Sequence, residues 1–243
     1  MEPKKNTKIA KNFEMIDLAL WLPKSKILAI TDLQLGYEEH LNKQGVFMPR
    51  VNYDEILKHL NEILKKVKPE KIIINGDLKH EFGNISEQEW REVLKLLAFI
   101  GGKCNEVIIV KGNHDTIVNP IAELKKIKVV DFYVAEKEKI LFIHGHKEPA
   151  KELLKGIKTI IIGHEHPAVV ITDGVKREKY KCFLRGTYKK KELIVLPSFN
   201  FVSMGTDVLH GKLLSPLLTN IEKFEVFAVE DKIYPMGKVK DLI

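Results

Sequence analysis

The sequence predicts an α/β sandwich of two facing sheets, and three observations support this fold class. The first part of the chain alternates short apolar runs with amphipathic helices. Those runs are rich in isoleucine and valine, which suits strands that are buried on both faces. From Ala168 onwards, strand-like segments follow one another without intervening helices. The 243 residues contain no repeat and no low-complexity linker, so we expect one domain over residues 1–243.

The first expected elements are two short strands at residues 16–22 and 26–32, joined by a turn. Residues 54–67 predict an amphipathic helix, because apolar side chains recur at helical spacing while lysine and glutamate fill the other face. Pro69 ends this helix. The continuous apolar run at 71–75 then predicts a buried strand.

The second helix is expected at residues 86–100, with a Ser-x-x-Glu capping box at its start and two glycines after its end. A buried strand follows at 106–110, and an Asn-Pro pair begins a short helix at 119–126. The remaining expected elements are a helix at 149–155, a long loop at 198–220, and strands at 129–134, 139–144, 158–162, 169–172, 182–188, 192–197 and 224–229.

The composition sets limits on the function classes. The formal net charge of +7 draws the chain towards polyanions, and nucleic acid is one candidate. Many lysines share helices with glutamates, so solvated helix faces account for most of this charge. The two cysteines, Cys104 and Cys182, have no partner at C-x-x-C spacing. Neither a disulfide framework nor a zinc ribbon is therefore indicated.

The sequence also indicates a compartment. No apolar run approaches the length that crosses a bilayer, so we expect no membrane partner. The basic amino terminus is not followed by the apolar region and cleavage site of a secretory signal. We therefore expect a cytoplasmic protein, and the sequence leaves open whether it forms an oligomer.

Polar side chains follow five of the apolar runs, at the point where each run ends. In an open α/β sheet, ligands bind outside the carboxyl ends of the strands, so we expect these side chains to converge. Glycines precede three of the clusters and allow the backbone to turn sharply there. The residues at the run ends are Asp32, Asp77, Asn113, His114, Asp115, His144, His146, His164 and His166.

The chemistry of these side chains predicts a metal centre. Imidazole and carboxylate ligands suit Mn, Fe, Zn, Co or Ni, and the absence of thiolates argues against a structural zinc site. Six ligands are too many for one catalytic metal that keeps an open position, and about the number that two metals need. A buried cluster without metal would leave polar groups that are costly to satisfy. The six residues are Asp32, Asp77, Asn113, His144, His164 and His166.

The order of these clusters resembles the calcineurin-like metallophosphoesterases. The family pattern is D-x-H, GD-x-x-[DEH], GNH[DE], a lone histidine and GH-x-H. The resemblance implies a metallophosphoesterase fold, an α/β four-layer αββα sandwich of two facing mixed sheets flanked by helices. The matching segments span roughly the first two-thirds of the chain and are Asp32-Leu-Gln34, Gly76-Asp77-Leu-Lys-His80, Gly112-Asn113-His114-Asp115, His144-Gly-His146 and Gly163-His164-Glu-His166.

The resemblance implies two divalent metal ions. Asp32 and His166 would bind the first ion, and Asp77 would bridge the two. Mn²⁺ is the expected ion, with Fe, Ni, Co and Zn as alternatives. The implied ligands of the second ion are Asn113, His144 and His164.

The resemblance also implies catalytic and supporting roles. His114 would stabilise the transferring phosphoryl group or protonate the leaving oxygen, and Asp115 would orient His114. His80 and His146 lie inside the motifs, and we expect them to support the ligands rather than to bind metal, because such sites need hydrogen-bonding partners.

Gln34 departs from the family pattern, which usually has histidine at this position. An amide oxygen is a weaker, neutral ligand than imidazole. As a ligand, Gln34 predicts weaker occupancy of the first site or a preference for a harder ion such as Mn²⁺. As an alternative, Gln34 hydrogen-bonds a metal-bound water. The sequence leaves both readings open.

The resemblance favours a phosphodiesterase that uses a hydroxide bridging two metals, with nucleic acid or nucleotides as candidate substrates. Segments 77–82 and 196–200 resemble phosphoesterases related to repair nuclease subunits, including the DNA-ligase-associated group. A phosphomonoesterase or small-nucleotide hydrolase is an alternative, because a large DNA-binding extension is missing. A non-catalytic scaffold is another, because Gln34 replaces a usual ligand.

Overall fold

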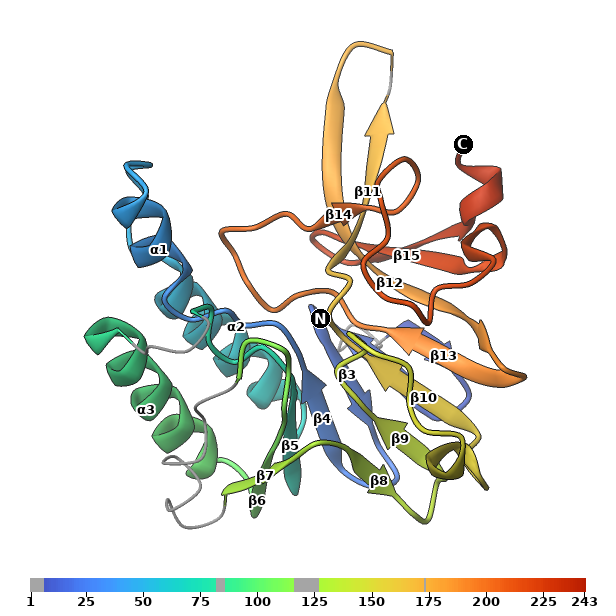
Figure 1. The fold of residues 1–243 in the computed structure, drawn as a ribbon, viewed down its shortest axis with the longest axis horizontal. Helices are drawn as coiled ribbons and strands as arrows, with labels where there is room; N and C mark the ends of the chain where they lie inside the picture. Colours follow the sequence, from blue (N-terminus) through green and yellow to red (C-terminus); the bar gives the residue numbers. More distant parts are fainter. Residues whose placement is uncertain (1–6, 82–85, 116–126, 173) are drawn as a thin grey trace.

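The computed structural model describes residues 7–81, 86–115, 127–172 and 174–243. Two mixed sheets face each other in this part of the chain, with the α-helices gathered beside one of them (Figure 1). The expected α/β sandwich of two facing sheets is confirmed. The helix expected at 119–126 lies outside the described residues.

The first sheet contains seven strands in the order of the sequence. Its first four strands pair antiparallel, and its last four pair parallel. The carboxyl ends of the parallel strands therefore share one edge. The strands are β1 (Thr7–Ala10), β2 (Phe13–Ile16), β3 (Ala19–Leu22), β4 (Ile27–Ile30), β5 (Lys71–Asn75), β6 (Glu106–Val110) and β7 (Ile127–Val130).

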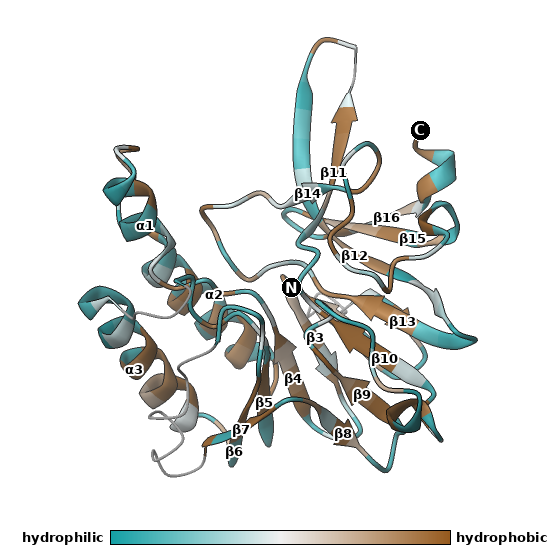
Figure 2. Ribbon diagram, in the orientation of Figure 1, coloured by the Kyte–Doolittle hydropathy of each residue, from teal (hydrophilic) through white to brown (hydrophobic). Residues whose placement is uncertain are grey.

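Helices α2 (Asn52–Lys66) and α3 (Glu87–Gly101) cover the outer face of the first sheet. Their apolar sides pack on this face, and Figure 2 shows their hydrophilic sides turned outward. The expected capping box of α3 is confirmed, since the Ser86 hydroxyl accepts a hydrogen bond from the Glu89 backbone N–H at 3.1 Å. Helix α1 (Tyr37–Lys43) was not expected.

The second sheet contains nine strands, and β9, β10 and β13 run parallel at its centre. Their inner side chains, such as Phe142 and Ile161, meet Ile73 and Ile108 of the first sheet in one core. The strands are β8 (Tyr133–Ala135), β9 (Ile140–Phe142), β10 (Thr159–Ile162), β11 (Pro167–Thr172), β12 (Arg177–Tyr188), β13 (Lys191–Val195), β14 (Thr206–Asp207), β15 (Glu225–Val229) and β16 (Ile233–Lys238).

The outer face of the second sheet is covered differently from that of the first. In the described residues its cover consists of loops and single 3₁₀ turns, which bury side chains such as Leu154, Leu217 and Val239. The helix expected at 149–155 is only a 3₁₀ turn at Glu152–Leu154. That prediction was wrong because so short a segment gains few helical hydrogen bonds for the cost of nucleation.

Two expected strands are each divided in the structure. The strand at 16–22 is interrupted at Asp17, which has a φ of 55° and accepts a hydrogen bond from the Leu18 backbone N–H. The strand at 129–134 is divided between β7 and β8, which belong to different sheets. No helix in the described ranges is long and apolar enough to span a membrane.

Candidate metal centre

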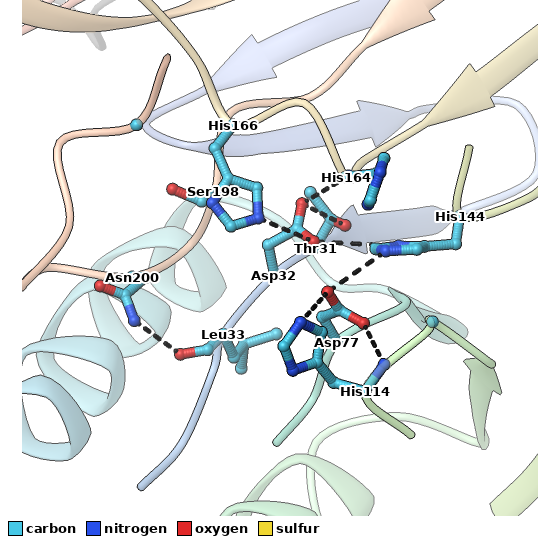
Figure 3. Close-up of polar contacts among 12 residues, drawn as sticks. Thr31, Asp32, Leu33, Asp77, His114, His144, His164, His166, Ser198 and Asn200 are labelled. Carbon is cyan, nitrogen blue, oxygen red and sulfur yellow. Dashed lines mark hydrogen bonds and ion pairs between the residues drawn. The ribbon is translucent and has the colours of Figure 1, made fainter. Parts of the chain in front are cut away.

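The carboxyl ends of the parallel strands bring the polar clusters together, as the sequence predicts. Asp32 follows β4, Asp77 follows β5, and His114 lies in the segment after β6. His144 follows β9 of the second sheet, and His164 follows β10. Figure 3 shows side chains from both sheets pointing towards a common centre. The facing of the two sheets therefore creates the site.

Two groups of three ligand atoms lie at this centre, and within each group the atoms are within 4.8 Å of one another. One group comes from Asp77, His144 and His164. The other comes from Asp32, Asp77 and His166. Asp77 belongs to both groups, so the arrangement can hold two cations that share one carboxylate. We call Asp32, Asp77, His166 and the expected ligand Gln34 the first half-site. We call Asp77, His144, His164 and Asn113 the second half-site.

His144 is the most constrained side chain of the second half-site. Its Nδ1 lies 3.1 Å from the backbone carbonyl of Asn75, which fixes Nδ1 as the donor. Its Nε2 lies 3.1 Å from the Asn113 amide oxygen and 3.3 Å from Asp77 Oδ2. A hydrogen bond from Nδ1 to a carbonyl is how a metal-binding histidine is usually oriented. Nε2 therefore faces the position that a cation would occupy.

In this half-site, burial and the neighbouring charges have opposite effects on the pKa values of His144 and Asp77. Burial opposes ionisation of the His144 imidazole, but the hydrogen bond to Asp77 and the Asp32 and Asp77 charges outweigh burial and raise its pKa to about 9. Burial likewise opposes ionisation of Asp77, yet His144 and His114 lower its pKa. Burial and the nearby His144 lower the pKa of His164 to about 4. A cation would compete with the His144 proton for the same carboxylates.

Asp32 anchors the first half-site. Its Oδ2 accepts hydrogen bonds from the Thr31 hydroxyl at 2.9 Å and the His164 backbone N–H at 3.0 Å. Its Oδ1 is buried without a hydrogen-bond partner and lies 3.2 Å from His166 Nε2. A buried carboxylate oxygen without a partner is costly. A divalent cation between Asp32 and His166 would satisfy it, so the residues present fit such an ion.

Gln34, the expected further ligand of the first half-site, is linked to the centre through its backbone. Its backbone N–H donates to the Asp77 carbonyl at 3.0 Å, so the two ligand segments are tied together. Its side chain is buried, and the carboxamide makes no hydrogen bond within the described part of the chain. Both interpretations of Gln34, as a ligand or as a partner of a bound water, stay predictions.

Backbone conformation marks the same residues. Positive φ values are uncommon outside glycine, and such strain gathers at functional sites. Five of the candidate ligands adopt this conformation, with φ between 46° and 65°. In three of them, Asp32, Asp77 and His164, the positive φ falls on the second residue after the strand ends. The five residues are Asp32, Gln34, Asp77, His164 and His166.

Glycine is required at two positions because the side chains approach the backbone closely. A Cβ on Gly76, whose φ is 97°, would lie 2.0 Å from His144 Nδ1. A Cβ on Gly112 would lie 2.0 Å from Asp77 Oδ1. Any larger residue at either position would displace a candidate ligand.

His114 lies beside Asp77 and is held there by backbone contacts. Its backbone N–H donates to Asp77 Oδ1 at 3.1 Å, and its Nε2 lies 3.8 Å from Asp77 Oδ2. Its Nδ1 contacts the backbone carbonyl of His80. Asp115 instead accepts hydrogen bonds from the backbone N–H groups of Leu78 and Gly112. The His80 carbonyl thus holds the His114 ring, and Asp115 ties the two loops together. The role of Asp115 in orienting His114 stays a prediction.

His80 and His146 flank the centre without belonging to either group of three ligand atoms. The His146 ring lies 5.5 Å from that of His144, and the His80 ring lies 5.5 Å from that of His114. Burial lowers the pKa of both, that of His80 to about 4, so both rings are neutral near pH 7. Their supporting role stays a prediction.

Sequence reasoning missed Asn75, which joins the two sheets beneath the centre. Its Nδ2 donates to the Ile143 carbonyl at 2.9 Å and the Ile161 carbonyl at 3.3 Å. Its own carbonyl meets His144. The available signal was a polar residue that ends an apolar strand directly before Gly76-Asp77.

Comparisons with known proteins show which proteins the chain resembles. A model of the calcineurin-like phosphoesterase family matches residues 25–191. The nuclease MPE of Pseudomonas putida has a similar structure, with a TM-score of 0.64 and 20% identity, over 92% of this chain and 94% of that chain. Yfce, a phosphoesterase from E. coli, gives a TM-score of 0.43 and 15% identity, over 89% of this chain and 94% of that one. No curated protein matches.

Proposed function

The chain belongs to the calcineurin-like phosphoesterase family, and we propose on this premise that it is a phosphodiesterase with two metal ions. Enzymes of this family hydrolyse phosphate esters and use divalent metals. The observation that carries the proposal is the Asp77 carboxylate, which both groups of three ligand atoms share. A shared carboxylate suits two ions that act on one phosphate group.

The residues would divide between the ions by half-site. Asp32, Gln34 and His166 would hold the first ion, Asn113, His144 and His164 the second, and Asp77 both. When bound, the ions would lower the pKa of a coordinated water and neutralise charge on the phosphoryl oxygens.

His114 would act on the phosphate group from beside Asp77. Its Nδ1 faces the His80 carbonyl and is the donor there, so its Nε2 is the nitrogen that can serve the substrate. Protonated at Nε2, the ring would donate a hydrogen bond to a phosphoryl oxygen or a proton to the leaving oxygen. Asp115 would support this role only indirectly, by holding the loops on which His114 and Asp77 lie.

The surroundings of the site support nucleic acid or nucleotides as substrates. Helix α1 and the β11–β12 hairpin project from the sandwich on two sides of the loop that follows β13 (Figure 1). Arg50 and the 90% exposed Phe47 follow α1, and the hairpin carries Arg177. Exposed cations and an aromatic ring suit phosphates and bases. The Pseudomonas putida protein with this fold is named a nuclease, which makes DNA and RNA the first polymers to test.

Mn²⁺ is the ion that we propose. Carboxylate and amide oxygens favour it, whereas imidazole also accepts Fe, Co, Ni and Zn. Asp32, Asp77, Asn113 and Gln34 would supply oxygen ligands, which would make the mixture richer in oxygen than a typical zinc site.

Hydrolysis of bis-p-nitrophenyl phosphate, compared with p-nitrophenyl phosphate, tests the proposal. Both would be assayed with Mn²⁺, with other divalent ions and with EDTA. We expect diester cleavage that depends on metal and falls by about 100-fold or more in His114→Ala. His210→Ala is the matched control, because His210 is exposed and its Nδ1 contacts Asp207, which is not a candidate ligand.

The outcomes separate the alternatives. Diester cleavage that survives in His210→Ala but not in His114→Ala supports the proposal and leads to assays on DNA and RNA. Cleavage of the monoester alone would replace it with a phosphomonoesterase. Folded protein that turns over neither substrate with any metal would favour a non-catalytic scaffold.

A further inference from the structure

Lys181 on β12 is buried, although it lies on no expected motif. It is 8% exposed, and its Nζ donates to the Ser198 hydroxyl at 2.7 Å and the Ser198 carbonyl at 3.0 Å. The third contact of Nζ is with the Asn200 carbonyl. An ammonium group has three donors, so these three acceptors satisfy it completely. All three belong to the segment after β13, which lies outside the residues that the family model matches.

An amine in this position is unusual because no acceptor carries a charge. Burial lowers the pKa of Lys181 to about 7, while Asp32 opposes this shift. A methionine of similar length would avoid the cost of burying the amine. The residue therefore has a use other than packing.

The segment that Lys181 holds is bonded in turn to the first half-site. The Phe199 backbone N–H donates to the Thr31 carbonyl at 2.8 Å. The Asn200 side chain donates to the Leu33 carbonyl at 3.1 Å, as Figure 3 shows. Asn52 of α2 donates to the same Leu33 carbonyl at 3.1 Å. Residues 31–33 are therefore held from two sides.

Leu33 separates two residues with strained backbones. Asp32 has a φ of 53° and Gln34 a φ of 46°. Strain of this kind persists only where the surroundings hold it in place. The Leu33 carbonyl, clamped by Asn200 and Asn52, is the anchor between them.

We propose that Lys181 is a positioning residue of the first half-site: by holding Ser198 and Asn200, it keeps the Leu33 carbonyl clamped and the Asp32 and Gln34 side chains aimed at the ion. This inference rests on the proposed two-metal function. The second half-site has supports of its own: the Asn75 carbonyl orients His144, while Asn113 and His164 follow β6 and β10.

Mn²⁺ titration of the purified chain tests the inference, with stoichiometry read by calorimetry and the coupled two-ion signal by electron paramagnetic resonance. The variants are Lys181→Met and Asn200→Ala. The matched control is Lys158→Met, the same substitution at an exposed lysine at the start of β10, the end of the strand away from the ligands. We expect affinity for one ion to fall by about 10- to 100-fold, as for other outer partners of metal ligands. The second ion should bind as in the wild type.

Selective loss of one ion and of the coupled signal in both variants, but not in Lys158→Met, supports the inference. Unchanged affinity for both ions would overturn it, and so would an equal loss of both, which indicates general damage. If Lys181→Met does not fold, the test uses Asn200→Ala alone, again by whether the affinity for only one ion is lost. A wild-type chain that binds fewer than two ions would instead refute the proposed function.

Discussion

The two half-sites share Asp77 but reach their geometry by different means. In the second, His144 is buried, its tautomer is fixed by the Asn75 carbonyl, and its Nε2 faces Asn113 and Asp77. In the first, Asp32 Oδ1 has no hydrogen-bond partner, and His166 is more exposed than His144. Gln34 adds a neutral amide there in place of an imidazole.

This difference shows which contacts hold the ligands of each half-site in place. The second is built by strand ends and by glycines that admit the ligands, such as Gly76 against His144. The first depends on a clamp at Leu33 from a segment far along the chain. We therefore expect the second half-site to bind its ion more tightly, and the predictions below test that ranking.

Replacement of the shared carboxylate should have the largest effect. Asp77→Asn keeps the size of the side chain but removes the charge that both ions would share. Loss of a residue that only hydrogen-bonds a metal ligand can lower activity by roughly 100-fold, and we expect phosphodiester cleavage to fall by more than this. The affinity for both ions should fall as well. Steady-state kinetics and Mn²⁺ stoichiometry measure this, and a variant that keeps both ions would contradict the shared role.

The paired variants His144→Ala and His166→Ala compare the half-sites directly. Each should lose one ion, but His144→Ala should also lower the free energy of unfolding by about 1–3 kcal/mol. It removes one of the two hydrogen bonds to the buried Asn75 carbonyl and leaves the buried Asp77 carboxylate without its imidazole partner. His166→Ala should change stability less, because its ring is partly exposed. Urea unfolding of the metal-free variants measures the difference, and equal losses would remove the distinction.

A Gln34→His variant should make the metal affinities of the two half-sites more similar. Histidine tolerates the positive φ at this position better than most residues, and imidazole is a stronger ligand than an amide. We expect affinity for the first ion to rise by about 10-fold, measured by calorimetry. No change would indicate that Gln34 contacts a bound water rather than the ion.

The smallest expected effect concerns the support of His114. Glu89 accepts hydrogen bonds from the backbone N–H groups of His80 and Ser86, and burial raises its pKa above the usual 4.5. A raised folded-state pKa adds stability that is present below pH 4.5 and lost as the pH rises through the folded value. The stability of the wild type should therefore fall relative to Glu89→Gln between pH 4 and pH 7, as urea unfolding would measure. A constant difference would contradict this assignment.

Much of the fold and the centre could be predicted from local sequence patterns. The apolar runs that became β4, β5 and β6 were each followed by a candidate ligand, and parallel strands align such ends at one edge of the first sheet. The capping box of α3 was equally local. The division of residues 127–135 between two sheets could not be predicted from a local pattern, because it depends on which partner strands are available.

The sequence by itself determined which side chains follow the strand ends of each sheet, whereas the facing of the two sheets brings those ends together. Only the tertiary structure decided how they are held. The His80 carbonyl contacts the His114 ring, and Lys181 and Asn200 hold the segments around Leu33. Asn200 and Leu33 are 167 positions apart, and no local periodicity records such a contact. Hydrogen bonds of this range form only after both sheets have packed, so only the packed fold specifies them.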